Sequence, residues 1–293
     1  MLTRPACWLL VVLGVLVYPA HAENETPALQ PLSTAELALA LRVPSSETVI
    51  YKGIVNNDSL SGAGQMMYPA PNAAGFIVAI ITHGILLEST KNTEKEQQQT
   101  QADQVLLPYR PVLNSYQYRS LMQAGLAKMP ANSNIRLAEV SEKPGSGWLI
   151  ESSPVFFLTE DQSAIVLDHA VLIYRPDASE PAYQNTVRVV SKRKDAPTDI
   201  QGFWIANQGE KLKEESANLF AQSLELTLND MSTELNAGNN PQKTVRYLQG
   251  RTEKMERGQV IRESCDRIVI KNLRGWIMSL PINPENPTSC TAG

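Results

Sequence analysis

The sequence has few of the residues on which many enzymes and metalloproteins depend. It contains 3 Cys and 3 His in 293 residues, and aromatic residues account for 6%. Three cysteines cannot build a disulfide-dense miniprotein. Histidine is the commonest acid–base residue and metal ligand, so its scarcity limits both kinds of chemistry. A surplus of basic residues is also missing. The net charge is -4, which argues against a dedicated nucleic-acid-binding protein.

The sequence motifs of common catalytic sites are absent as well. The chain contains no Gly-x-Ser-x-Gly, Ser-x-x-Lys, Gly-x-x-x-x-Gly-Lys-Ser/Thr or Gly-x-Gly-x-x-Gly motif. His83 could join a helical zinc pair only with a ligand four residues away, and those positions hold Ala79 and Leu87. We therefore predict no catalytic residue, no metal site and no cofactor.

The chain begins with the features of an export signal. Arg4 is the only charged residue before an apolar run over residues 7–18, which is too short to cross a bilayer. Ala20 and Ala22 then place small side chains where a signal peptidase reads them. We predict a signal peptide over residues 1–22, cleaved after Ala22, and a secreted or periplasmic protein with no transmembrane span after cleavage. The alternative is an uncleaved N-terminal anchor.

Cleavage would remove Cys7 and leave Cys265 and Cys290 as the two thiols of the exported chain. An even number of cysteines in an oxidising compartment favours a disulfide. The predicted Cys265–Cys290 bond closes a loop of about 25 residues. Two free thiols are the alternative.

Composition divides the exported chain into three parts. Residues 23–46 contain several prolines and few aromatic residues, which is typical of a linker with at most a short helix over residues 33–41. Residues 47–240 carry strand-like and helix-like patterns and form the predicted main domain. Residues 241–293 form a predicted small module that is basic and β-rich.

An apolar segment over residues 73–88 follows a plausible helix N-cap at Asn72, and the next proline is Pro108. We predict a helix that is apolar nearly all round in its first half and polar over residues 88–104. The apolar half is either a core helix or a docking surface for a partner or a membrane. The candidate partner-binding residues in it are Phe76, Ile80 and Ile85.

The rest of the main domain alternates in the manner of an α+β fold. Apolar residues at helical spacing predict helices over residues 114–129 and from Asn207 to about residue 238. β-rich runs between turn residues predict strands. These strands cover residues 48–55, 135–140, 148–158, 164–174 and 186–190. The predicted fold is a central antiparallel β-meander with covering helices and a small C-terminal β module.

The C-terminal module concentrates positive charge. Between Lys243 and Arg274 there are nine Lys or Arg and four Asp or Glu, a local net charge of +5. Arg246, Arg262 and Arg267 are the candidate partner-binding residues in this module. The charge would attract an anionic partner such as a lipid headgroup or a cell-wall polymer, although a run of charge is more often a solvated face.

His169 and Asp168 are neighbours in sequence but do not form a predicted catalytic pair. In a strand, adjacent side chains point to opposite faces, so His169 would lie among Ile165, Leu167 and Val171, with Asp168 on the other side. We predict a buried structural histidine.

These observations favour an exported, non-catalytic binding or accessory protein of the periplasm or cell envelope, with another envelope protein or an anionic surface as its partner. The balance of these observations favours a protein that is not an enzyme, without deciding the question. The alternative is an exported hydrolase of a cell-wall or carbohydrate substrate. It would use His169 or a carboxylate pair drawn from Glu151, Glu160, Asp161 and Asp168.

Overall fold

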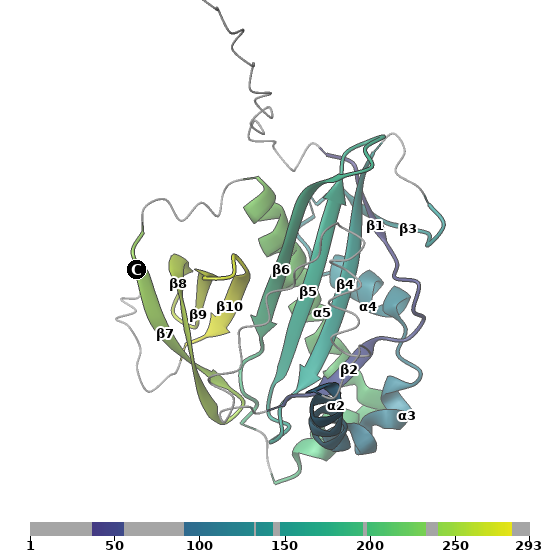
Figure 1. Ribbon diagram of the computed structural model, residues 1–293. Helices are drawn as coiled ribbons and strands as arrows, with labels where there is room; N and C mark the ends of the chain where they lie inside the picture. The colour runs from purple at the N-terminus through teal and green to yellow at the C-terminus, as the bar shows by residue number, and fades with distance from the viewer. Residues whose placement is uncertain are drawn as a thin grey trace, which may run out of the picture. The chain divides into compact units, whose positions relative to one another are not determined.

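A mixed sheet of ten strands forms the centre of the computed structural model (Figure 1). The structure describes residues 37–55, 91–131, 133–142, 147–195, 198–232 and 240–282. The strands are β1 Leu39–Arg42, β2 Ile50–Gly53, β3 Ile135–Ala138, β4 Trp148–Leu158, β5 Ile165–Tyr174, β6 Pro181–Val190, β7 Gln242–Gln249, β8 Thr252–Glu263, β9 Arg267–Asn272 and β10 Ile277–Pro281. The helices are α2 Lys91–Ala102, the 3-10 helix η3 Asp103–Tyr109, α3 Arg110–Leu113, α4 Tyr118–Leu126 and α5 Ile200–Met231. The predicted α+β class is confirmed.

The strand order is β3-β1-β4-β5-β6-β10-β9-β8-β7, with β2 also paired to β4. Strands β4, β5 and β6 form the predicted antiparallel meander. Strand β10 then pairs in parallel with β6, and β10, β9, β8 and β7 form a second antiparallel meander. The C-terminal strands therefore extend the main sheet.

All ten residues of strand β5 are buried, and it is the longest described strand of which this is true. Its sequence is an almost continuous apolar run, which is typical of a strand covered on both faces. Helix α5 covers one face, where Phe220 packs beside His169, and α4 packs against α5 (Figure 1). Of the apolar stripe predicted for this helix, Leu212, Phe220, Leu224 and Leu228 are buried, and Met231 is partly exposed.

A second apolar cluster lies on the other face of the sheet and joins its two meanders. Val166 and Val190 of β5 and β6 pack with Tyr247, Ile270 and Met278 of the C-terminal strands. The sheet therefore curls until the β7–β8 turn reaches the β4–β5 turn. At that point the backbone N–H of Arg251 donates to the Asp161 carboxylate at 2.9 Å. The C-terminal strands share their core with the main domain.

Strand β1 differs from the sequence-based expectation. Residues 39–42 were expected in a linker, with at most a short helix over residues 33–41. They form instead a strand that pairs in parallel with both β3 and β4, and Leu41 is completely buried. Pairing partners far along the chain determine this conformation, because four residues carry too little pattern of their own. The predicted apolar helix over residues 73–88 lies outside the described residues, and α2 begins at Lys91.

Helix α5 contains the break that its sequence indicates. Residues Asn207, Gln208 and Gly209 have φ values of 51°, 58° and 77°, so the long regular helix starts after them, as the predicted helix opening at Asn207 requires. Glycine is needed at the last position for two reasons. Its φ is left-handed, and an added Cβ would collide with the side chain of Val112.

Gly209→Ala tests this steric constraint. We expect it to lower the free energy of unfolding by about 1–3 kcal/mol more than the matched change Gly275→Ala. Gly275 also has a positive φ, of 82°, but nothing lies within 4 Å of its added Cβ, so it reports the backbone cost alone. Urea unfolding of the two variants gives the comparison. Equal losses of unfolding free energy in the two variants would show that the Val112 side chain moves aside without destabilising the protein.

Candidate functional site

His169 lies at the centre of a small polar network inside the core. It is completely buried between β5 and α5. Its Nε2 lies 2.6 Å from the Ser152 hydroxyl of β4, and its Nδ1 lies 2.8 Å from the Ser223 hydroxyl of α5. Ser223 donates its own proton to the Phe220 carbonyl oxygen at 2.7 Å. The network therefore assigns the histidine proton to Nδ1, with Ser152 donating to Nε2.

The Ser152–His169 pair has the distance of a catalytic dyad but not its accessibility. Ser152 is 5% exposed and Ser223 is completely buried, so a substrate has no path to either hydroxyl. Desolvation by burial lowers the pKa of His169 to about 3, which keeps the ring neutral at physiological pH. In the described conformation the histidine joins β4, β5 and α5 and has no access to a reactant.

Asp168 points to the opposite face, as the strand alternation predicts. Its two carboxylate oxygens accept from Nε and Nη2 of Arg188 on β6, each at 2.6 Å. Burial disfavours the charged Arg188 guanidinium, but the adjoining Asp168 raises its pKa above the ordinary value. Trp276 lies 5.5 Å from the guanidinium. This bidentate pair holds β5 to β6, and its carboxylate is not available as a catalytic base.

The other candidate carboxylates lie apart from Asp168. Glu151 forms an ion pair with Arg42 of β1 and accepts from the Tyr174 hydroxyl at 3.4 Å. Glu160 and Asp161 occupy the β4–β5 turn at the edge of a pocket of about 280 Å³. Of the four candidate carboxylates, only Glu160 and Asp161 line the same pocket, and these two are already neighbours in sequence.

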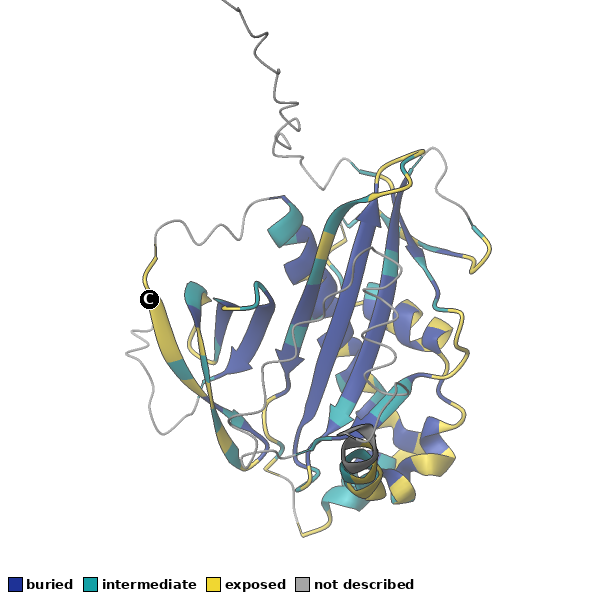
Figure 2. Ribbon diagram, in the orientation of Figure 1, coloured by how far each residue is buried: buried dark blue, intermediate teal, exposed yellow. Residues whose placement is uncertain are grey.

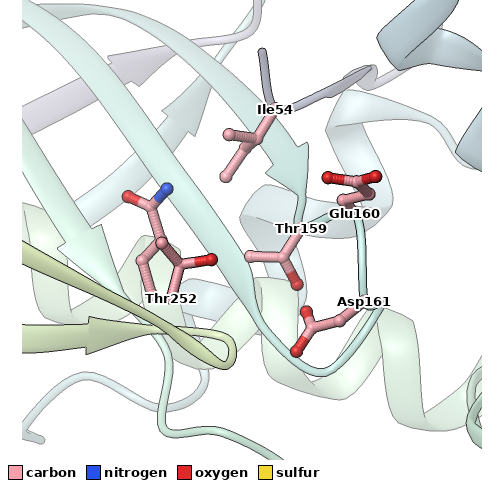
Figure 3. A pocket seen from close by; sticks show the side chains of 6 residues that line it. Ile54, Thr159, Glu160, Asp161 and Thr252 are labelled. Atoms are coloured by element: carbon pink, nitrogen blue, oxygen red, sulfur yellow. The ribbon is translucent and has the colours of Figure 1, made fainter. Parts of the chain in front are cut away.

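This pocket lies where the two turns of the curled sheet meet (Figure 3). It is lined by Ile54, Thr159, Glu160, Asp161, Gln249 and Thr252. Burial opposes ionisation of the Asp161 carboxyl, but hydrogen bonds from Ser163, Thr159 and the Arg251 N–H outweigh it and lower its pKa. Asp161 therefore stays ionised and fastens the β7–β8 turn. An added Cβ at Gly250 would lie 2.5 Å from its carboxylate, so this turn needs glycine.

The hairpin of β7 and β8 carries the exposed part of the basic C-terminal segment. Thr244 faces Arg257, and Arg246 faces Met255, on the same side of the hairpin. Arg246 and Arg257 are exposed, and Met255 is 60% exposed. Figure 2 shows the exposed first half of β7 at the end of the sheet. Sequence reasoning identified Arg246 and missed Met255, whose exposure depends on which face the strand register turns outward.

The other two candidate arginines lie in different surroundings. Arg262 is exposed near the end of β8, beside a register shift between Val260 and Arg262. Arg267 is partly buried at the start of β9, where its guanidinium donates to the Val190 carbonyl at 2.7 Å and to Ser279 at 2.9 Å. Arg267 therefore helps to hold the sheet together.

Several predictions concern residues that the structure does not describe. Phe76, Ile80, Ile85, His83, Cys290 and the cleavage point after Ala22 all lie outside the described residues. Cys265 is exposed and forms no disulfide within the described part of the chain. The Cys265–Cys290 bond and the role of the apolar segment stay predictions.

Comparisons with known proteins add no functional assignment. No protein-family model matches the chain, and no curated protein matches it. Within the described ranges, no helix is long and apolar enough to cross a membrane. The same ranges contain no group of three or more His, Cys, Asp or Glu side chains that could hold a metal ion.

The depressed pKa of His169 gives a prediction about acid stability. The unfolded chain takes up a proton near pH 6.5 and the folded chain only near pH 3, so stability falls as the pH drops through this interval. We expect a loss of about 1.4 kcal/mol per pH unit below the upper limit. His169→Gln should be less stable than the native protein at neutral pH, yet lose less stability on acidification. Urea unfolding between pH 7 and pH 5 measures both slopes, and parallel slopes would contradict the assignment.

Asp161→Ala tests whether the Asp161 carboxylate stabilises the contact between the β4–β5 turn and the β7–β8 turn. We expect it to lower the free energy of unfolding by about 1.5–3 kcal/mol, because it removes charge-assisted hydrogen bonds to Ser163 and Arg251. Asp195→Ala is the matched control, since that carboxylate is 78% exposed and forms a surface pair with Arg193. Chemical unfolding should separate the two variants, and a loss no larger than that of the control would sink the idea.

Proposed function

We propose that the protein is an exported, non-catalytic binding protein of the periplasm or cell envelope and that the β7–β8 hairpin presents its binding face to an acidic partner protein. The observation that carries this proposal is the position of β7. It stands at the end of the sheet and pairs only with β8 among the described strands. Among the described residues, the outer edge of this eight-residue strand has no pairing partner, so its backbone groups can accept an extended segment.

The side chains on the hairpin indicate the chemistry of that partner. Lys243 and Arg246 on β7 disfavour pairing with a second copy of the same strand, because like charges would face one another. Arg246 pairs with Glu253 of β8 at 2.9 Å, whereas Arg257 forms no ion pair within the described part of the chain. Met255 lies opposite Arg246 and next to Arg257 on the same face of the hairpin, and it offers an exposed apolar contact. An extended segment with acidic and apolar side chains complements this surface.

The interior of the fold supports a non-catalytic role. The buried histidine is neutral and out of reach of solvent, and Asp168 is held by two hydrogen bonds from Arg188. Each of these groups is held by hydrogen bonds to neighbouring strands or to α5. The predicted signal peptide supplies the export part of the proposal.

A hydrolase is the second candidate because the Figure 3 pocket collects Glu160 and Asp161. Hydrolysis of a cell-wall glycan that is abolished by Glu160→Gln in a folded protein would favour it over the binding role. The engagement of both Asp161 oxygens by hydrogen bonds from Ser163 and from the Arg251 N–H argues against it, because a glycosidase needs a second carboxylate that is free to act as nucleophile or base.

The experiment is a pull-down from envelope extract with the purified protein and with the double variant Arg246→Glu/Arg257→Glu. We expect the native protein to retain a specific acidic envelope protein and the double variant to lose about tenfold or more in affinity, since two attractions become repulsions. The charge-matched control is Arg193→Glu/Lys211→Glu, which changes two exposed cations outside the hairpin.

Equal retention by native protein and double variant would remove the hairpin from the binding face. Loss of the partner in the control as well would show a nonspecific effect of net charge. No retained partner at all, together with hydrolysis of a glycan substrate, would transfer support to the hydrolase.

A further inference from the structure

A second hollow lies on the helix side of the sheet, between the end of β6, the start of β9 and helix α5. It has a volume of about 290 Å³ and is lined by Lys192, Lys194, Glu215, Asn218, Leu219, Gln222 and Arg267. Three of these side chains are cations. It is distinct in position from the β7–β8 hairpin, so conclusions about it do not depend on the proposed function.

The ion pairs around the hollow leave one cation without a carboxylate. Lys192 pairs with Asp266 at 2.7 Å, and Lys194 pairs with Glu215 at 2.9 Å. Arg267 forms no ion pair within the described residues. Its hydrogen bonds go from Nε and Nη2 to Ser279 and to the Val190 carbonyl. The second terminal nitrogen, Nη1, makes no hydrogen bond to the described residues.

Burial makes this missing counter-ion consequential. Desolvation lowers the pKa of Arg267 to about 10, and the more distant Asp266 and Glu215 offset it only in part. The partly buried guanidinium keeps a free N–H group and has no paired carboxylate. Burying its charge is therefore costly, because no anion compensates it. A bound anion would complete it.

Helix α5 contributes neutral donors at the same place. Asn218 and Gln222 are one helical turn apart and therefore lie on the same face of α5, toward the hollow. Neither side-chain amide makes a hydrogen bond to the described residues, so both N–H groups are available. Leu219, which is 3% exposed, is the apolar residue of the lining.

We propose that this hollow is a binding site for a phosphate group, with Arg267 Nη1 and the amides of Asn218 and Gln222 as donors and with Lys192 and Lys194 supplying positive charge at its rim. The phosphate group is either free inorganic phosphate or the headgroup of an anionic lipid. Both present the same oxygens to the same donors. Glu215 stays paired with Lys194 and limits the site to one such group.

The test is titration calorimetry with inorganic phosphate, using sodium chloride at matched ionic strength as the reference. The main variant is Asn218→Ala/Gln222→Ala, because alanine at helical positions preserves folding. We expect saturable binding to the native protein and affinity weaker by about tenfold or more in the variant, which loses two hydrogen bonds to a charged group. Lys211→Gln on the same helix is the control, since Lys211 is exposed and lies outside the hollow. It should bind like the native protein.

A second arm distinguishes the source of the phosphate. Sedimentation with phosphatidylglycerol vesicles is compared with phosphatidylcholine vesicles for the same three proteins. Selective sedimentation that Asn218→Ala/Gln222→Ala reduces, without binding of inorganic phosphate, assigns the site to a lipid headgroup. Binding of inorganic phosphate alone assigns it to the free ion. Absence of both kinds of binding, or equal binding by the variant and the native protein, would overturn the proposal.

Arg267→Lys provides an independent check on the central cation. It keeps the charge but removes the planar guanidinium and Nη1, so phosphate affinity should fall although net charge does not change. Circular dichroism establishes whether the variant folds. If it does not, the comparison of Asn218→Ala/Gln222→Ala with Lys211→Gln decides the question, because neither variant changes a contact that holds the sheet together.

Discussion

The fold depends on the burial of one strand on both of its faces. All ten residues of β5 are removed from water, and a strand in that position needs a cover on each side. Helix α5 supplies one cover. On the other face, the curl of the sheet brings Tyr247, Ile268 and Trp276 of the C-terminal strands against Val166 of β5. The C-terminal strands are therefore a structural requirement of the main sheet, and a boundary near residue 240 would divide a shared core.

Double burial also determines where polar groups can lie. Each face of β5 carries one polar side chain deep in the fold, and each has partners from neighbouring elements. His169 bonds to Ser152 of β4 and Ser223 of α5 on one face. On the other face, Asp168 takes a bidentate bond from Arg188 of β6. A register slip of one residue would exchange the two faces and leave a charge and an imidazole unpaired. These groups specify the register of the central strands, which explains why residues that resemble catalytic ones belong to the core.

The sequence predicted the elements with strong local patterns and missed those fixed by distant contacts. The strand over residues 148–158 agrees with β4 at both ends, because a long β-rich run between turn residues carries its own signal. The placement of His169 and Asp168 on opposite faces followed from the two-residue period. Strand β1 has only four residues, and its partners come from residues 135–138 and 148–151. Arg267 was selected for its charge, but the hydrogen bonds that make it structural reach Val190, 77 residues away.

The burial of both faces of β5 also explains why the exposed side chains available for binding lie on the C-terminal strands. Helix α5 covers the strands at the centre of the sheet, and the ion pair between its Asp230 and Lys271 links it to β9. Strands β7 and β8 lie beyond it. Their inner side chains, such as Tyr247, belong to the shared core, whereas their outer side chains have no covering element among the described residues. Because β7 and β8 are buried on one face only, core and solvent positions alternate along them. Met255 and Arg257 occupy solvent positions. Where the cover of α5 ends over the start of β9, it leaves the hollow around Arg267.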